Sequence, residues 1–256
     1  MMIRSDVIRI FLSLVFSIVM TVVSKVNASQ LDALNVEINK NPNNYRAYFN
    51  LAGILLGLKD YHGAAEKYQF LIDINEKVQL PVIEPFENTS QFLGRVHMGL
   101  GFALDFLNED QKAIRELKKA VSIDPGLENH LMLQTTIGAI YGDLGFKEKE
   151  LSQYQRVIEI DPKFYRAYLN LAIALGETGK ISQSITILER VIVIKPDYAK
   201  AYSQLGVAHE IMHNPKKAIK YYLIALKIYS NLNDEKPENE IKRRLERLYK
   251  VTGTPS

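Results

Sequence analysis

The chain has 256 residues, of which 47% are hydrophobic and 24% are charged, a composition ordinary for a folded protein. It contains no cysteine, which excludes a disulfide framework, a thiolate zinc site and a lipidated cysteine. The formal net charge is +3, and removing residues 1–28 lowers it by two units to +1. Because nucleic-acid binding depends on clustered lysine and arginine, this near-neutral remainder predicts no nucleic-acid partner.

The N-terminal segment has the three parts of a secretory leader. Arg4 and Arg9 precede an apolar run from Ile10 to Val23, and Val26-Asn27-Ala28 offers small residues for cleavage. We therefore predict a signal peptide over residues 1–28, with an uncleaved membrane anchor over residues 7–26 as the alternative. Both interpretations predict an exported protein, in a periplasm, envelope, lumen or extracellular space. Contact with the membrane is expected only through this segment, if it stays uncleaved.

Amphipathic segments are predicted to cover both ends of the folded region. Residues 29–44 predict an N-terminal capping helix, whose apolar positions are Leu31, Leu34 and Ile38. Residues 233–256 predict a charged C-terminal capping helix and tail, with Leu245 and Leu248 as the buried points.

A short pattern recurs between these two ends. Pro162 and Pro196 lie 34 residues apart, and a bulky aliphatic residue, a small residue and a turn glycine precede each of them. The two series are Ile137, Gly138 and Gly145, and Leu171, Ala172 and Gly179. A period of this length indicates helix-turn-helix units that stack and share one core.

The unit at residues 165–198 resembles the tetratricopeptide repeat. The matching positions are Tyr168, Leu171, Ala172 and Leu175 in its first helix, and Ser184, Leu188 and Val191 in its second. Four more units follow the same register, at residues 45–78, 94–127, 131–164 and 199–232. The resemblance implies an all-α solenoid over residues 45–232, a right-handed superhelix of about five repeats. Glu150 departs from the pattern, because an alanine is expected there.

One insertion interrupts the period at residues 79–93. It contains two prolines and several apolar side chains, among them Phe86 and Phe92. We interpret it as a packing extension that covers the edge of a helix. The alternative is a docking or gating loop.

The sequence His209-Glu210-Ile211-Met212-His213 matches the H-E-x-x-H motif of zinc peptidases. On one helix, its histidines would bind zinc and its glutamate would activate water. The repeat register argues against this chemistry: His209 takes the core position of Leu175, and His213 takes the turn position of Gly179. We therefore predict no enzyme, no metal and no cofactor, and expect Glu210 to be neither a general base nor part of the core.

The family resemblance also implies that the first helix of each unit lines a concave groove. The second position of the units is mostly basic, with Arg46, Arg95, Met132, Arg166 and Lys200. The other predicted partner-binding residues are Phe49, Asn50, Met98, Phe102, Leu169, Asn170, Ile173, Ser203, Gln204 and Val207. An apolar floor with a basic rim suits an extended or helical peptide with acidic groups. The competing interpretation is that these basic residues are ordinary solvated charges.

These features predict a non-enzymatic scaffold or assembly adaptor, exported or membrane-tethered, that holds a partner peptide or helix in its groove. Two alternatives remain open. One is a zinc-dependent hydrolase using residues 209–213. The other is a self-assembling scaffold, in which the groove of one copy holds a helix of the next.

Overall fold

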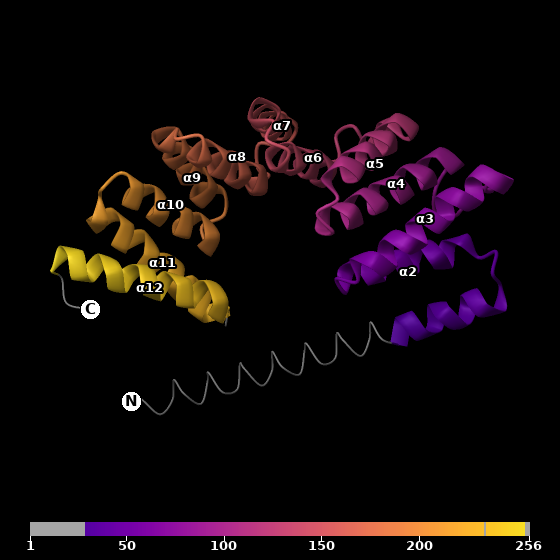
Figure 1. Cartoon of the computed structure of the whole chain (residues 1–256), viewed down its shortest axis with the longest axis horizontal. Coiled ribbons are helices and arrows are strands. Elements are labelled where there is room, and N and C mark those ends of the chain that lie inside the picture. The colour runs from indigo at the N-terminus through magenta and orange to yellow at the C-terminus, as the bar shows by residue number, and fades with distance from the viewer. Residues whose placement is uncertain (1–28, 233, 254–256) are drawn as a thin grey trace. The chain divides into compact units, whose positions relative to one another are not determined.

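The computed structural model describes residues 29–232 and 234–253, and all their regular structure is helical (Figure 1). Residues 29–40 form the first described helical segment. The later elements are α2 (Tyr45–Gly57), α3 (Tyr61–Val78), α4 (Thr89–Phe106), α5 (Asp110–Ile123), the short 3₁₀ helix η1 (Pro125–Leu127), α6 (Leu131–Asp143), α7 (Lys147–Ile160), α8 (Tyr165–Glu177), α9 (Ile181–Ile194), α10 (Ala199–Ile211), α11 (Pro215–Leu232) and α12 (Glu235–Thr252).

The predicted all-α class is therefore confirmed, whereas the handedness of a superhelix stays a prediction. The predicted leader or anchor lies outside the described residues. Among the helices of the described part, none is both long and apolar enough to cross a membrane.

The backbone repeats with the same period as the sequence. The second residue after the first helix of each predicted repeat has a positive φ, in the left-handed region that favours glycine. These residues are Lys59 (66°), Asn108 (58°), Gly145 (79°), Gly179 (77°) and His213 (52°). The same tight turn thus joins the two helices of every repeat, including the repeats that have no glycine at this position.

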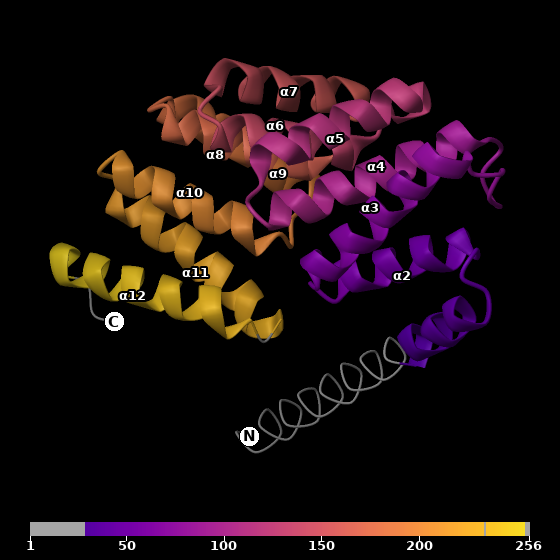
Figure 2. The ribbon, with the colours of Figure 1, turned by 45° about the vertical axis from the view of Figure 1, so that its right-hand side comes forward.

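The chain divides within α6 into two compact units, residues 1–136 and 137–256. In the first unit, α2 pairs with α3 and α4 pairs with α5 (Figure 2). Asn44 and Asp60 begin α2 and α3 by accepting hydrogen bonds from the backbone amides of Ala47 and Gly63. The core contains the fully buried side chains Leu71, Phe92 and Leu117.

The structure shortens the predicted insertion. Helix α4 begins at Thr89, because the Asn88 side chain accepts a hydrogen bond from the Gln91 amide at 2.9 Å and caps the helix. Of the predicted insertion at residues 79–93, only residues 79–88 are non-helical. Phe92 therefore lies within α4 with 0% exposure, and its assignment to a docking loop is wrong.

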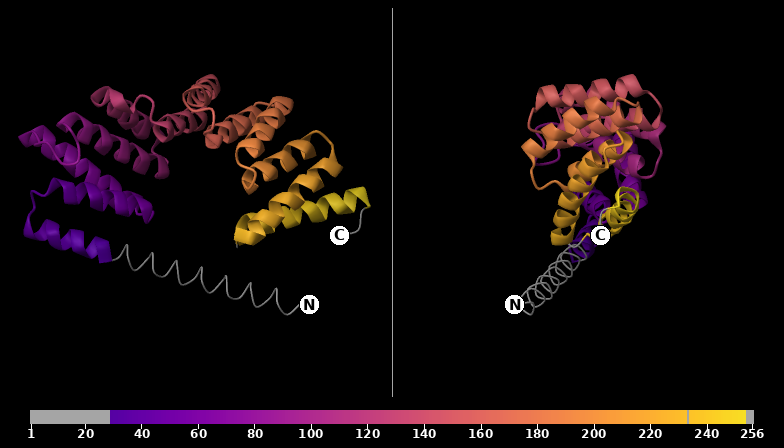
Figure 3. Two further views of the ribbon diagram at one scale, coloured as in Figure 1. Left: turned by 180° about the vertical axis from the view of Figure 1, so that it is seen from behind. Right: turned by 90° about the vertical axis from the view of Figure 1, so that its left-hand side faces the viewer.

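The second unit contains the pairs α8–α9 and α10–α11, followed by α12. Helix α11 contacts both α10 and α12 (Figure 3, orange to yellow). The buried side chains of α12 pack against Ala218, Tyr222 and Ala225 of α11. They are Ile241, Leu245 and Leu248, so both predicted buried points are confirmed.

The departure at Glu150 is balanced by a neighbouring glycine. Glu150 is only 7% exposed, and a Cβ at Gly142 would lie 2.6 Å from its carboxyl group. The glycine therefore provides the space that the larger side chain requires. Lys147 forms an ion pair with Glu150 at 2.9 Å, which partners the buried carboxylate.

Candidate functional site: a hollow between α8 and α10

A hollow of about 320 Å³ lies where α8, α9 and α10 meet in the second unit. It contains three of the predicted partner-binding residues, Ile173, Gln204 and Val207. The other lining residues are Ala172, Gly176, Glu177, Ile181, Ser184, Ala208 and Ile211. Ile173 and Val207 occupy equivalent positions of consecutive repeats, so the 34-residue period brings two half-buried aliphatic side chains to one site.

The walls of this hollow are mainly apolar. Ser184 donates a hydrogen bond from Oγ to the Ala172 carbonyl oxygen at 2.6 Å, so its hydroxyl is already bonded within the protein. Gly176 adds no side chain, and a Cβ there would meet only Ser184 Oγ, at 3.7 Å. Gln204 is half-buried and supplies an amide that can donate and accept hydrogen bonds. The arrangement suits an aliphatic side chain whose backbone bonds to an amide.

The other predicted positions of this unit differ in accessibility. Arg166 and Lys200 are exposed, while Asn170 and Ser203 are half-buried. Leu169 is 2% exposed and belongs to the core cluster with Tyr168 and Leu188, so its assignment to the partner-binding surface is wrong. Its side chain fills the space between stacked repeats.

In the first unit, the predicted floor residue Phe49, at the position equivalent to Leu169, is covered by the chain itself. The Phe86 ring lies edge-on to Phe49 at 5.7 Å, and to Phe92 at 5.4 Å. Phe49 also contacts the ring of Tyr68, at 6.0 Å. Phe86 of the loop thus covers the predicted floor residue Phe49, which agrees with the interpretation as a packing extension. Burial raises the pKa of Tyr68 to about 12, as expected for a phenol beneath this cluster.

The other predicted partner-binding residues of the first unit are more accessible to solvent. Arg46 and Asn50 are exposed, and Arg95, Met98 and Phe102 are half-buried. Two of the four basic positions therefore lie in each unit, and a continuous basic rim along the groove stays a prediction.

The H-E-x-x-H segment does not have the helical geometry on which its zinc chemistry depends. Helix α10 ends at Ile211, and His213 lies beyond it in a left-handed conformation. His209 is 7% exposed and stacks on the Tyr221 ring at 5.4 Å, so it packs as its register predicted. Burial lowers its pKa. In the part of the chain that the structure describes, no three His, Asp or Glu side chains form a cluster suited to a metal.

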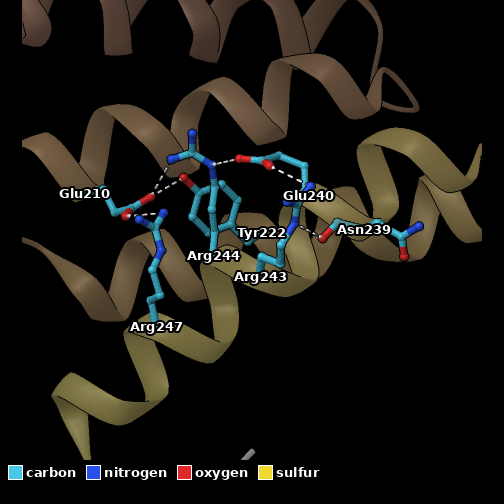
Figure 4. A network of polar contacts seen from close by, with 7 residues as sticks. All are labelled: Glu210, Tyr222, Asn239, Glu240, Arg243, Arg244 and Arg247. Atoms are coloured by element: carbon cyan, nitrogen blue, oxygen red, sulfur yellow. Dashed lines mark hydrogen bonds and ion pairs between the residues drawn. The ribbon is translucent and has the colours of Figure 1, made fainter.

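Glu210 has a structural role that the sequence did not reveal. Its Oε2 accepts hydrogen bonds from the Tyr222 hydroxyl at 2.5 Å and from Arg244 Nη1 at 3.1 Å (Figure 4). Arg244 also donates a hydrogen bond from Nε to Glu240 at 3.0 Å. These contacts connect α10, α11 and α12 through a half-buried carboxylate, so Glu210 lies outside the buried core, as expected, but bonds to two neighbouring helices. Arg244 lies 34 residues from Glu210 in the sequence, so no local sequence pattern predicted that the two side chains form a pair.

Sequence signatures described as tetratricopeptide repeat match residues 94–127, 153–186 and 199–234. The middle match begins in α7 and ends in α9, 12 residues before the repeat at residues 165–198. No curated protein sequence matches the chain.

Several solved structures are similar in fold. YrrB, described as a TPR protein with an unusual peptide-binding site, has a TM-score of 0.55 at 18% identity, covering 85% of this chain and 99% of YrrB. MamA from Desulfovibrio magneticus RS-1 has a TM-score of 0.58 at 18% identity, covering 73% of this chain and 96% of the other. A chain of the APC/C Cut9–Hcn1 hetero-tetramer has a TM-score of 0.65 at 13% identity, covering 87% and 39%. The chain thus carries tetratricopeptide repeats, and it shares the helical repeat fold of these structures.

Proposed function

We propose that this protein is a non-enzymatic interaction scaffold that holds a partner peptide or helix in the hollow between α8 and α10. The observation that carries the proposal is that Ile173 and Val207, chosen from the repeat pattern, both line that hollow. An apolar recess with one amide beside it suits the side chain and backbone of a polypeptide.

The chemistry of the partner follows from the exposed residues of the same two helices. Arg166 is the second residue of α8 and Lys200 is the second residue of α10, and both are exposed. A partner with an aliphatic anchor and nearby carboxylates would bury the anchor in the hollow and place its acids toward these cations. Such rim charges mainly accelerate association, whereas the buried anchor governs dissociation.

The proposal includes an exported or membrane-tethered location. It is supported by Arg4 and Arg9, the apolar run from Ile10 to Val23, and the small residues that follow. The terminal residue of the mature protein, measured by mass spectrometry of native material, distinguishes a cleaved leader from an anchor. A start near Ser29 supports cleavage, and an intact Met1 in the membrane fraction supports the anchor.

A glycine substitution tests the hollow itself. Gly176→Leu places a side chain in the hollow without a backbone clash, because only Ser184 Oγ lies within 4 Å of its Cβ position. Gly57→Leu is the matched control, since nothing lies within 4 Å of that Cβ in α2. We expect partners captured from native membranes by the wild-type protein to be lost by Gly176→Leu and kept by Gly57→Leu. If Gly176→Leu captures the same partners with unchanged affinity, the hollow is not the binding site.

A further inference from the structure

Helix α11 has an outer face that neither the core nor the hollow uses. Three exposed lysines and one exposed leucine lie on it at the spacing i, i+4, i+7 and i+11, which aligns them along one side of a helix. These four residues, which we call the α11 stripe, are Lys216, Lys220, Leu223 and Lys227. At 1.5 Å per residue, the stripe is roughly 16 Å long.

The charge of this stripe is uncompensated. Helix α11 contains no aspartate or glutamate, and within the described residues none of the three lysines takes part in an ion pair. Glu210 contacts the helix only through the buried Tyr222, and Glu189 and Asp234 lie near Tyr221 and Tyr229. The outer face of α5 is also basic, but that helix contains Asp110 and Glu116, and its Lys112 pairs with Glu109.

An apolar side chain lies in the middle of this positive charge. Leu223 is 45% exposed, between Lys220 and Lys227. Near the start of α11, Ile211 and Met212 are also exposed, at 52% and 50%. Lysines on flexible stems, with apolar side chains between them, are typical of helices that lie on an anionic bilayer.

We propose that the α11 stripe binds the surface of an anionic membrane. All its cations are lysines, which act as compact point charges, whereas arginine is favoured for the bidentate recognition of defined carboxylates. The stripe follows the outer side of a single helix, so it suits a broad, diffuse negative surface better than a peptide that needs a groove. Leu223 would enter the interface while the lysines remain among the headgroups. This contact is independent of the groove and of the leader.

The absence of cysteine makes a site-specific test possible in the full-length protein. An environment-sensitive fluorophore on Leu223→Cys reports on the stripe, and the same label on Val193→Cys, 68% exposed on α9, is the control. Vesicles of phosphatidylcholine alone are compared with vesicles that also contain phosphatidylserine. We expect the emission at position 223 to shift to the blue only with phosphatidylserine, and less at high salt. The label at position 193 should not change.

Reversing the charge of the three lysines tests whether they cause the binding to anionic vesicles. Lys216→Glu with Lys220→Glu and Lys227→Glu should reduce the phosphatidylserine-dependent response by about 100-fold in lipid concentration. Lys112→Glu with Arg115→Glu and Lys119→Glu on α5 makes the same change in net charge and should retain the response. A response at position 223 that survives the α11 reversal would overturn the proposal. So would a blue shift with polyglutamate or duplex DNA as large as that with vesicles, because the stripe would then be a general polyanion site.

Discussion

The two units place corresponding helices in the same register, but the long loop before α4 has no counterpart before α10. In the first unit, Phe86 of this loop lies against Phe49 and covers that residue of the predicted floor. In the second unit, Ile173 and Val207 line a hollow of about 320 Å³. The difference arises from the connections: residues 79–88 join α3 to α4, whereas only residues 195–198 join α9 to α10. The longer connection thus brings an aromatic ring onto a predicted floor residue of the first unit.

Truncating the aromatic side chains around Phe92 in the first unit should cause the largest loss of stability. Phe92→Ala removes a side chain with 0% exposure and should lower the free energy of unfolding by about 3–5 kcal/mol. Phe86→Ala removes a half-buried ring and should cost about 1 kcal/mol, because solvent already reaches part of it. Chemical denaturation of both variants measures the difference. Equal losses would mean that the loop is part of the core rather than its cover.

The close helix contact of the second unit should be the next most sensitive feature. Gly206 faces the Tyr222 ring so closely that an added Cβ would overlap it. Gly206→Leu should therefore destabilise the protein by about 1–3 kcal/mol through overpacking. Gly57→Leu is again the matched control, since it meets open space. A neutral Gly206→Leu would show that α10 and α11 can separate without loss.

The hydrogen bonds between Glu210, Tyr222 and Arg244 should make a smaller contribution to the free energy of unfolding. Glu210→Gln keeps the shape of the side chain but removes the charge that Arg244 faces, at 3.1 Å. Because Arg244 is 28% exposed, we expect a loss of about 1 kcal/mol in unfolding free energy, with partner capture unchanged. Full stability together with lost function would instead support the hydrolase alternative.

A substitution at His213 should raise the free energy of unfolding, whereas the preceding variants should lower it. His213 has φ = 52°, where Gly145 and Gly179 occupy the equivalent positions of other repeats. His213→Gly should stabilise the protein by roughly 0.5–1 kcal/mol, because glycine adopts this conformation without steric cost. The same variant removes the second histidine of the H-E-x-x-H motif. The melting temperature should therefore rise while partner capture is retained, and a lower melting temperature would contradict this account of His213.

Acid should weaken the first unit through one buried pair. His97 Nδ1 lies 2.6 Å from Glu116 Oε2, and this hydrogen bond lowers the pKa of Glu116 below its usual 4.5. A carboxyl group whose pKa is lowered by folding contributes stability above pH 4.5, and loses it as the pH falls through the lowered pKa. Glu116→Gln should therefore flatten the dependence of unfolding free energy on pH below about 4.5. An unchanged acid dependence in this variant would show that the pair does not couple folding to protons.

The sequence by itself determined the helical class and the repeat register. Helix formation and the 34-residue period depend on local spacing, so Leu171 and Ala172 identified a core face, and Gly179 a turn, without any contact being known. The same register assigned His209 to packing and His213 to a turn, and both assignments are confirmed.

Only the tertiary structure decided which of the predicted groove positions are accessible. Leu169 and Ile173 lie one turn apart on α8, yet the first is 2% exposed and the second lines the hollow. Phe49 is covered because a loop folds back from residue 86, and Glu210 is bonded because α12 brings Arg244 to it. Local spacing assigns a residue to one side of a helix. Whether that side is open or filled depends on side chains that arrive from distant parts of the chain.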